Sequence, residues 1–496
     1  MLILVLEAST ASAKAMLYLS GEGIIGLLPK NYSAEAGDIL TYDADKIMTE
    51  TLLAGRELLE QKGIDNVDMV ATCSIWSHSL LMLDKNKQPV SRLSTWADTT
   101  SSTTTEKYRR DNSLYLSLYK RTGCPIHATY TVWKYMHEKE TGSLNNVSFI
   151  ASMPEYLFLK LTGEFAVAKS TASAGGFLNL HTLNWDEEAL KLAGVDESML
   201  PMLVDSEHTA PLSQEAAAAL GLKQGTPVLI TGADGCMNQV AAGAFGDNIM
   251  TLSVGTSAAM RIATEKPVLA SYPSTWCYVG VENMWIAGSA TAGAGNCVDW
   301  IGKKILGLNG GISLQELDQG AEGALLKGDA PIFLPFLAGE RSPGWDDTKS
   351  AMMCELKINN DIYDLYYAVL EGVLFNLKHC YEITVPVMGQ PPKFISISGG
   401  IEKSPLWLSM ASSIFGLPVY ANGLMHASLL GAAYMGLKAA GEISSVKEIK
   451  PLIKNCCQPD SHKSEFFAKR FEKYLIYYNQ QSEGRSAFLA REGVTA

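Results

Sequence analysis

Two short segments with the same plan, about half a chain apart, constrain the fold most. The first is "LVLEASTASAKAMLYL" near the N-terminus, and the second is "MTLSVGTSAAMRIAT" near the middle of the chain. In each, an apolar run is followed by a small turn rich in hydroxyl groups and then by a second apolar run, which is typical of a β-hairpin. The turns lie at Ser9 and Gly255. The repetition indicates duplication of one domain, with chance as the alternative because short apolar strands are common.

The segments that follow each hairpin indicate that both halves are α/β. After the first hairpin, apolar residues recur at helical spacing between Asp43 and Gly63, which are typical start and stop signals of a helix. We expect two domains around a cleft, residues 1–244 and 245–496. The other expected elements are the strand "VDMVATCSI", the strand "FISISGG", the helix "SPLWLSMASSIFG", the strand "LPVYA" and the helix "ASLLGAAYMGLKAAG".

Composition excludes several classes of protein. With 496 residues, of which 47% are hydrophobic and 19% charged, the chain can bury large cores. The opening "MLILVLEAST" is too short for a signal peptide or a membrane span, so we expect a cytoplasmic protein. A net charge of -12 argues against nucleic acid or a membrane surface as a partner. An anionic substrate would need a local positive pocket.

The cysteines predict neither disulfides nor a zinc site. There are nine, none of them in a CxxC pair, and the adjacent Cys456 and Cys457 are poorly placed to bridge. We expect reduced thiols without a chemical role.

The turn at Gly255, Thr256 and Ser257 suits a phosphate. Backbone N–H groups and hydroxyls at a hairpin tip are donors, and a glycine lets the backbone approach a ligand closely. Two such tips facing one cleft could hold one polyphosphate. A plain hairpin turn is the alternative for either tip taken alone.

Asp234 follows an apolar strand and stands between Gly232 and Gly235. It is either the N-cap of the next helix or a carboxylate presented to a cleft. Its neighbourhood favours the cleft, because a carboxylate beside a phosphate site can accept the proton of a hydroxyl that attacks a γ-phosphate.

The stretch from Leu229 to Arg261 resembles the FGGY carbohydrate kinases, and the likeness continues over nearly the whole chain. The resemblance implies two duplicated actin/hexokinase-like (ribonuclease H-like) domains, with sugar held mainly by the first and ATP by the second. It implies that Asp234 is the general base and that Glu7 and Asp234 help to place Mg²⁺. The ATP contacts that it implies are Glu7, Thr10, Ser12, Lys14, Gly255, Thr256, Ser257, Gly295, Gly399 and Gly400.

Segments in the first half resemble the gluconate kinase branch of that family, and the xylulokinase branch shares the framework. The resemblance therefore implies D-gluconate as acceptor, with D-xylulose as the alternative, and it is compatible with a homodimer. Each proposed sugar contact also has a structural alternative: a buried histidine, a core tryptophan or a loop-capping aspartate. The implied contacts are Ser77, His78, Trp96, Asp98 and Asp234, and the segments are "SHSLLMLD", "STWAD", "TGCPIHATYTVWKY", "LTGEFAVAKSTASAGG" and "NWDEEAL".

Several positions depart from the pattern of the family or, at Thr100 and Ala168, from that of the gluconate kinase branch. The loss of an arginine at Thr100 weakens the gluconate assignment, because arginine is the natural partner of a carboxylate. The departures at Glu7 and Ser9 motivate a further alternative, a non-catalytic nucleotide- or sugar-binding regulator. The departures are Glu7 for an aspartate, Ser9 for a glycine, Thr100 for an arginine, Ala168 for an aspartate, and Ser409, Ser412 and Ser413 for a glutamine and an alanine-aspartate pair.

Overall fold

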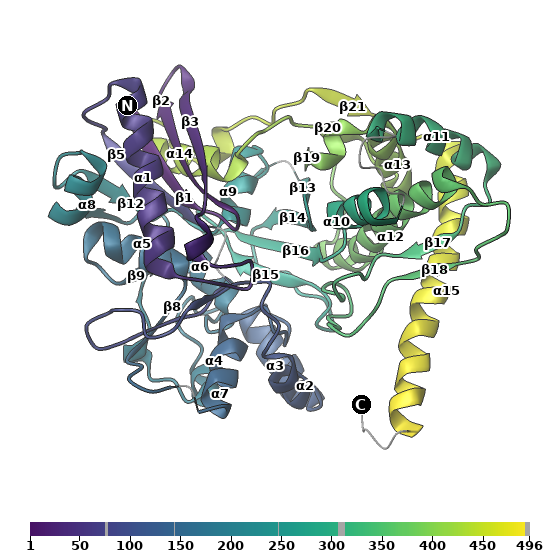
Figure 1. The fold of residues 1–496 in the computed structure, drawn as a ribbon, viewed down its shortest axis with the longest axis horizontal. Helices are drawn as coiled ribbons and strands as arrows, with labels where there is room; N and C mark the ends of the chain where they lie inside the picture. The colour runs from purple at the N-terminus through teal and green to yellow at the C-terminus, as the bar shows by residue number, and fades with distance from the viewer. Residues whose placement is uncertain (75–77, 143, 247, 306–312, 492–496) are drawn as a thin grey trace.

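The computed structural model describes residues 1–74, 78–142, 144–246, 248–305 and 313–491. Figure 1 shows two lobes, each built around a large sheet, with the early part of the chain in one lobe and most of the later part in the other. The long helix α15 (Ser461–Arg491) runs along the far edge of the second lobe.

The first large sheet is mixed. Strands β1 and β12 lie on either side of β5 and run parallel to it. Strand β2 pairs antiparallel with β1, β3 pairs antiparallel with β2, and β11 pairs antiparallel with β12. Strand β1 is the predicted first strand of the hairpin, and β5 is the predicted strand "VDMVATCSI". In order across the sheet the strands are β11 (Thr209–Pro211), β12 (Pro227–Leu229), β5 (Met69–Ser74), β1 (Leu2–Ala8), β2 (Ser12–Leu19) and β3 (Gly23–Asn31).

The second large sheet repeats this plan. The run β16-β14-β13-β19-β20-β21 matches β3-β2-β1-β5-β12-β11 in the sense of every pairing. The predicted duplication is therefore confirmed in the strand topology, and β15 is an addition at one edge. The strands are β15 (Trp276–Val279), β16 (Trp285–Thr291), β14 (Ala258–Thr264), β13 (Ile249–Val254), β19 (Phe394–Gly399), β20 (Val419–Ala421) and β21 (Asn455–Cys457).

Helix α1 (Ala44–Lys62) confirms the predicted helix after the first hairpin. The Asp43 side chain accepts from Lys46 N at the start, and Gly63 ends the helix at φ 63°. A left-handed residue at this position suits glycine, because it has no Cβ to clash with the preceding turn. Ile47, Leu58 and other apolar side chains of one helix face are buried against the first sheet.

The second lobe is centred on helix α12 (Ile362–Met388), which is predominantly buried. Arg470 of α15 closes this core, because its guanidinium lies 2.6 Å from a carboxylate oxygen of the buried Glu371. The predicted helix after "FISISGG" is α13 (Pro405–Phe415), which begins after Ser404 and ends before Gly416.

Helix α14 (Ala427–Ala439) comes from the second half of the sequence but packs in the first lobe. It contacts α9 (Asp234–Ala241), β1 and β5, and Leu429 lies in the same core as Ile3 (Figure 1). A Cβ on Gly431 would lie 2.0 Å from Met237 O, so glycine permits the close approach of α14 and α9. The division of the chain at residue 244 stays a prediction. Helix α14 lies after that residue in the sequence but packs in the first lobe.

The remaining elements cover the sheets or extend the lobes. No helix in the described part of the chain combines the length and apolarity that a membrane span requires. The helices are α2 (Ser102–Arg109), α3 (Asn112–Thr122), α4 (Thr131–Glu140), α5 (Met153–Thr162), α6 (Lys169–Ala172), α7 (Glu187–Ala193), α8 (Gln214–Leu220), α10 (Gly295–Asp299) and α11 (Leu314–Lys327); the short strands are β4 (Thr41–Tyr42), β6 (Leu81–Leu83), β7 (Leu93–Ser94), β8 (Phe149–Ala151), β9 (Ala166–Ala168), β10 (Met202–Val204), β17 (Ile332–Leu334) and β18 (Met352–Cys354).

Candidate active site

A cavity of about 500 Å³ is lined by residues of both lobes. Its walls include Thr10 and Ala11 from the first hairpin tip and Gly255, Thr256 and Ser257 from the second. The two tips that the sequence analysis paired therefore line one cavity. Its volume lies in the range of small-molecule sites, and its walls carry both apolar and polar groups.

Asp234 lies in the wall of the same cavity. It is the first residue of α9, whose N-cap is Ala233, and no side chain caps this helix end. Burial raises the pKa of Asp234 to about 6, and the negative charge of Glu7 adds to this, whereas Arg261 and Lys14 oppose it. A carboxylate with this pKa is ionised near neutral pH and can still accept a proton, as a general base must.

The second hairpin tip is fixed by hydrogen bonds within the backbone. Gly255 N donates to Ser257 O at 2.9 Å, and the tip is tied to the start of α10 because Gly295 N donates to Gly255 O at 2.9 Å. A Cβ on Gly295 would lie 2.4 Å from that same oxygen, so only glycine fits. Gly295 thus holds the tip in place and is not itself among the residues that line the cavity.

Gly399 and Gly400 lie where β19 ends beside the second tip. Gly399 has φ 99°, and a Cβ on it would lie 2.3 Å from Val254 O. Glycine is therefore required for the close packing of β19 on β13. Both glycines are exposed, and neither lines the cavity, so their contact with ATP stays a prediction.

Glu7 is completely buried beneath the first tip. One of its oxygens lies 2.7 Å from Lys14 Nζ, and the other accepts from Ser428 Oγ at 2.5 Å. Ser9, the second departure in this segment, donates its hydroxyl to Ser12 O at 2.6 Å. These bonds explain how the tip is held, with Glu7, Ser12 and Lys14 behind the cavity wall.

The residues predicted to place Mg²⁺ fit the ion unequally. Asp234 reaches the cavity, and Mg²⁺ is commonly held by one or two carboxylates together with phosphate oxygens and water. Glu7 does not fit as a direct ligand, because both of its oxygens are engaged and the Lys14 cation lies beside it. Across the described residues, no group of three or more His, Cys, Asp or Glu side chains is placed to hold a metal.

Besides Asp234, two of the predicted sugar contacts line the cavity, His78 and Trp96. His78 Nε2 lies 3.2 Å from the Tyr278 hydroxyl, and Trp96 Nε1 donates to Thr10 Oγ1 at 3.2 Å. Burial lowers the pKa of His78 to about 3, and the positive charge of Arg341 contributes, so the imidazole is neutral. Ser77 lies outside the described residues.

Asp98 lies behind the cavity wall. It is 7% exposed, and its carboxylate accepts from Thr100 N at 3.0 Å and lies 4.0 Å from Lys134 Nζ. The capping interaction weighed in the sequence analysis is therefore present. Its contact with a sugar stays a prediction.

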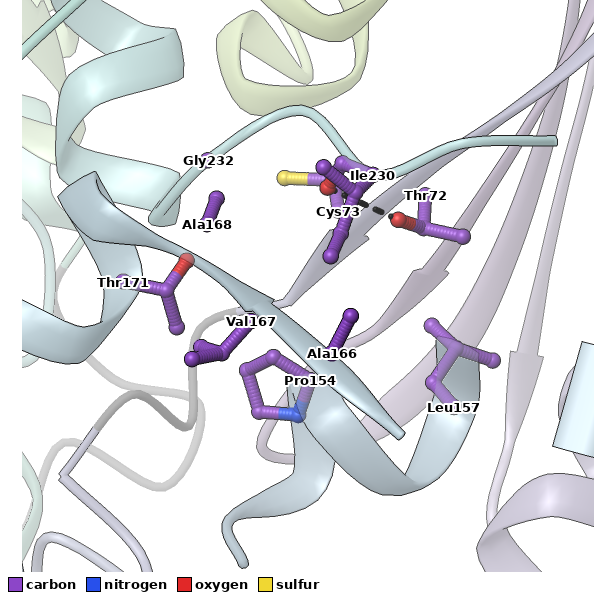
Figure 2. A pocket seen from close by; sticks show the side chains of 10 residues that line it. All are labelled: Thr72, Cys73, Pro154, Leu157, Ala166, Val167, Ala168, Thr171, Ile230 and Gly232. Atoms are coloured by element: carbon purple, nitrogen blue, oxygen red, sulfur yellow. Dashed lines mark hydrogen bonds between the residues drawn. The ribbon is translucent and has the colours of Figure 1, made fainter. Parts of the chain in front are cut away.

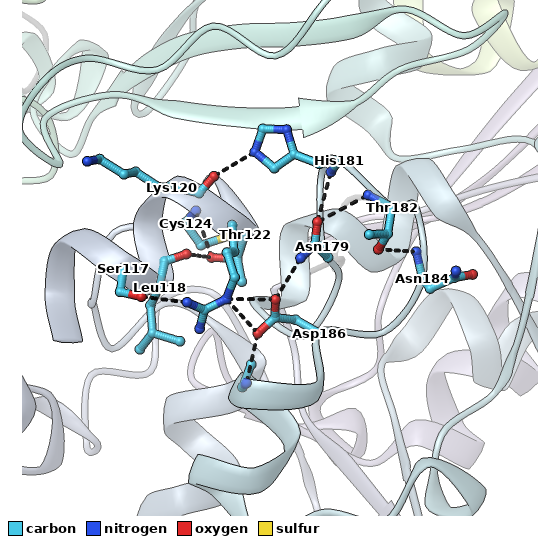
Figure 3. Close-up of polar contacts among 12 residues, drawn as sticks. Ser117, Leu118, Lys120, Thr122, Cys124, Asn179, His181, Thr182, Asn184 and Asp186 are labelled. Carbon is cyan, nitrogen blue, oxygen red and sulfur yellow. Dashed lines mark hydrogen bonds and ion pairs between the residues drawn. The ribbon is translucent and has the colours of Figure 1, made fainter.

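Two segments that carried the resemblance to the gluconate branch make contacts within the first lobe. Ala168 lines a separate cavity of only about 10 Å³, where Thr72 donates to Ile230 O at 3.0 Å (Figure 2). In "NWDEEAL", Asp186 caps α7, accepts from Asn179 and lies 2.9 Å from Arg121 (Figure 3). Neither Ala168 nor Asp186 lines the large cavity.

Two of the serines that depart from the family pattern in α13 make hydrogen bonds to a later part of the chain. Ser412 donates its hydroxyl to Cys457 O at 2.9 Å, and Ser413 Oγ accepts from Asp460 N at 3.2 Å. Both are buried and join α13 to the segment that leads into α15.

Among the residues of the cavity wall that sequence reasoning missed are three with polar side chains, Arg261, Tyr278 and Arg341. Arg261 lies against the start of α9, where a Cβ on Gly235 would be 2.9 Å from its Nε. The available signal was modest: Arg261 ends the stretch that resembles the FGGY kinases, and Arg341 lies in the segment "GERSPGWDD". The two arginines supply the local positive charge that an anionic substrate requires.

Two α/β lobes with the same sheet topology share a cavity that is lined by both hydroxyl-rich tips and by Asp234, which is the arrangement predicted for a two-lobed kinase. Residues 2–242 match the N-terminal domain of the FGGY family of carbohydrate kinases, and residues 250–440 match its C-terminal domain. The chain belongs to this family and is a sugar kinase. Kinases of this family use ATP.

Similar proteins include kinases of two different sugars. A gluconokinase from Bacillus licheniformis is 29% identical over 467 residues, which cover 90% of this chain and 89% of the relative. A xylulose kinase from Escherichia coli is 28% identical and covers 70% of this chain and 72% of its own length. Crystal structures of a xylulose kinase and a gluconate kinase from Lactobacillus acidophilus superpose with TM-scores of 0.91 and 0.90, at 22% and 23% identity. The first covers 98% of this chain and 99% of its own, and the second 98% and 100%.

Proposed function

We propose that this protein transfers the γ-phosphoryl group of MgATP to a terminal hydroxyl of D-gluconate. The position of Asp234 carries the proposal for the reaction, because its carboxylate lies in one cavity with both hairpin tips. The similarity to gluconokinases over 90% of the chain supports the choice of acceptor.

In the proposed reaction, Asp234 accepts the proton of the attacking hydroxyl. The hydroxyl oxygen forms a bond to the γ-phosphorus, and the bond from that phosphorus to the β,γ-bridging oxygen breaks, leaving ADP. The raised pKa of Asp234 suits this role, since a base works best when its pKa lies near the operating pH. Mg²⁺, when bound, neutralises phosphate charge.

Other residues of the wall would bind and orient the reactants. The tips at Thr10 and Thr256 offer hydroxyl and backbone donors to the phosphates. His78 can hydrogen-bond a hydroxyl in its neutral form, and the Trp96 plane can cover carbon atoms of the acceptor. Closure of the lobes would exclude water that could otherwise hydrolyse ATP.

A panel of acceptors tests the proposal. ADP release is measured with MgATP and D-gluconate, D-xylulose or glycerol, and Asp234→Asn serves as the control for contaminating kinases. We expect turnover with D-gluconate, lost in the variant. Turnover with D-xylulose alone would overturn the choice of acceptor and leave the kinase assignment in place. Binding without ADP release from any acceptor would favour a non-catalytic regulator.

A further inference from the structure

The guanidinium of Arg341 lines the large cavity without a carboxylate partner among the residues that the structure describes. Its Nε is buried and makes no hydrogen bond to the described part of the chain. Placing a cation in a partly buried site without a counter-charge is costly. Such an arrangement is typical of a group whose partner is a ligand.

Arg341 is held in a fixed position from both sides. The next residue, Ser342, bonds to the end of β16 twice: its N donates to Ala290 O at 2.9 Å, and its hydroxyl accepts from Ala290 N at 3.2 Å. The Arg341 guanidinium lies 5.8 Å from the ring of Trp345, which is fully buried and donates to Ser274 O at 3.1 Å. The side chain is therefore presented to the cavity by a packed support, as a binding residue requires.

The surroundings place Arg341 at the acceptor end of the cavity. Trp345, whose ring lies 5.8 Å from the guanidinium, packs against Tyr130 with ring centroids 6.1 Å apart, and Tyr130 packs against His78 with ring centroids 5.4 Å apart. Both of these neighbours are neutral at neutral pH, because burial lowers the pKa of His78 and raises that of Tyr130. Arg261 lies beside Asp234, where its charge opposes the rise in the pKa of that carboxyl. Burial lowers the pKa of Arg261, and the charge of Arg341, which also reaches Arg261, lowers it further. Arg261 also donates to Ser253 at 3.3 Å, where β13 approaches the second tip.

The wall of the cavity therefore has more positive than negative charge. Its ionised side chains are Arg261, Arg341 and Asp234. Arg261 lies beside the Asp234 carboxylate, where the reaction is proposed to occur. Arg341 is therefore left to bind an anion on the side of the cavity that contains His78. This distribution is the opposite of that of the whole chain, whose net charge is -12.

We propose that Arg341 binds the carboxylate of a sugar-acid acceptor and so selects aldonates over neutral sugars. This inference rests on the proposed function and assigns the residue that recognises the acid. A guanidinium can donate two parallel hydrogen bonds to a carboxylate, which adds specificity as well as affinity. Arg341 would thereby supply the positive charge for which the family pattern offers an arginine at the position of Thr100.

The test compares an acid with a neutral acceptor of the same carbon length. Steady-state rates are measured for wild type, Arg341→Gln and Arg341→Lys with D-gluconate and with D-glucitol. In Arg341→Gln we expect kcat/KM for D-gluconate to fall by about 10²- to 10³-fold, with KM for ATP and the rate with D-glucitol nearly unchanged. Arg341→Lys should restore part of the loss, because it keeps the charge but not the paired donors.

Arg56→Gln is the matched control, since Arg56 pairs with Glu60 on the outer surface of α1. Calorimetric titration of each folded variant with D-gluconate, without nucleotide, separates binding from turnover. A raised KM for ATP with unchanged D-gluconate affinity in Arg341→Gln would assign the guanidinium to phosphate and overturn the inference. An equal loss for both acceptors would also overturn it.

The same measurements distinguish this inference from the proposed function. If wild type binds D-gluconate in an Arg341-dependent manner but does not phosphorylate it, the proposed reaction fails and the carboxylate site stands. If wild type phosphorylates D-gluconate and Arg341→Gln does so equally well, the reaction stands and the carboxylate site fails.

Discussion

Trp96 and Thr10 join the proposed acceptor side of the cavity to the first hairpin tip: the indole Nε1 donates to Thr10 Oγ1 at 3.2 Å. The two residues belong to segments that the sequence analysis assigned to different ligands. The bond fixes the plane of the indole from the tip that is proposed to bind phosphate. The position of the acceptor surface thus depends on the same turn as the proposed nucleotide site.

A double-mutant cycle with Trp96→Phe and Thr10→Val measures this dependence. Each change removes the hydrogen bond and keeps most of the side-chain volume. Neutral hydrogen bonds contribute about 0.5–1.5 kcal/mol, so we expect a coupling free energy of this size in KM for the acceptor. Additive effects within about 0.3 kcal/mol would show that the indole is positioned independently of the tip.

Asp234→Asn separates a base from a structural residue. Asparagine keeps the size of the side chain but cannot accept the proton, so turnover at saturating acceptor and MgATP should fall by roughly 10²- to 10⁴-fold. Because burial raises the pKa of Asp234 from its ordinary 3.8 to about 6, the ionised carboxylate is less favourable in the folded than in the unfolded protein. The melting temperature of the variant above pH 6 should therefore equal or exceed that of wild type. Near wild-type turnover in a folded variant would refute the base assignment.

The pH profile should report the same group. A general base must be deprotonated, so kcat/KM should rise with pH and level off above a midpoint near 6. In Glu7→Gln the midpoint should move lower, because the negative charge of Glu7 contributes to raising the pKa of Asp234. A profile that is flat from pH 5 to 8 in wild type would contradict the assignment.

The buried pair of Glu7 and Lys14 should contribute to stability. In Glu7→Gln the Lys14 ammonium loses its counter-charge, and breaking a buried pair in this way costs roughly 3 kcal/mol. Urea unfolding at pH 7 measures the loss. Glu465→Gln is the control, since Glu465 and Lys469 form an exposed pair, whose removal changes stability by about 0–1 kcal/mol. Equal effects of both changes would show that burial adds nothing to the Glu7 pair.

Gly255→Val tests the second tip. The nearest atom to a Cβ on Gly255 is Ser257 O at 3.8 Å, so the side chain has room and the fold should persist. The valine would occupy the space that a phosphate needs, and ATP affinity by calorimetry should fall at least tenfold. Gly246→Val, at another open glycine outside the cavity wall, is the control. Unchanged ATP affinity in folded Gly255→Val would remove this tip from the nucleotide site.

Local sequence patterns predicted the hairpins, α1 and the cleft position of Asp234, because each depends on neighbours along the chain. Asp43 and Gly63 are sufficient signals for the ends of α1, for example. Arg341 could not be placed in the same way. Its position depends on Ser342 bonding to β16 and on a tryptophan packed beneath it, which are contacts between distant segments. Asp98 shows the converse, since its motif was recognised but the side chain caps the loop behind the wall.

The return of α14 to the first lobe has a consequence for how the protein is made. Leu429 and Ala433 complete a core that begins with Ile3 and Val5. During synthesis, this core cannot be completed until nearly the entire second lobe has left the ribosome. We therefore expect that neither half folds completely by itself. Until then, the surface of β1 and α9 that α14 covers is apolar and open to chaperones or to aggregation.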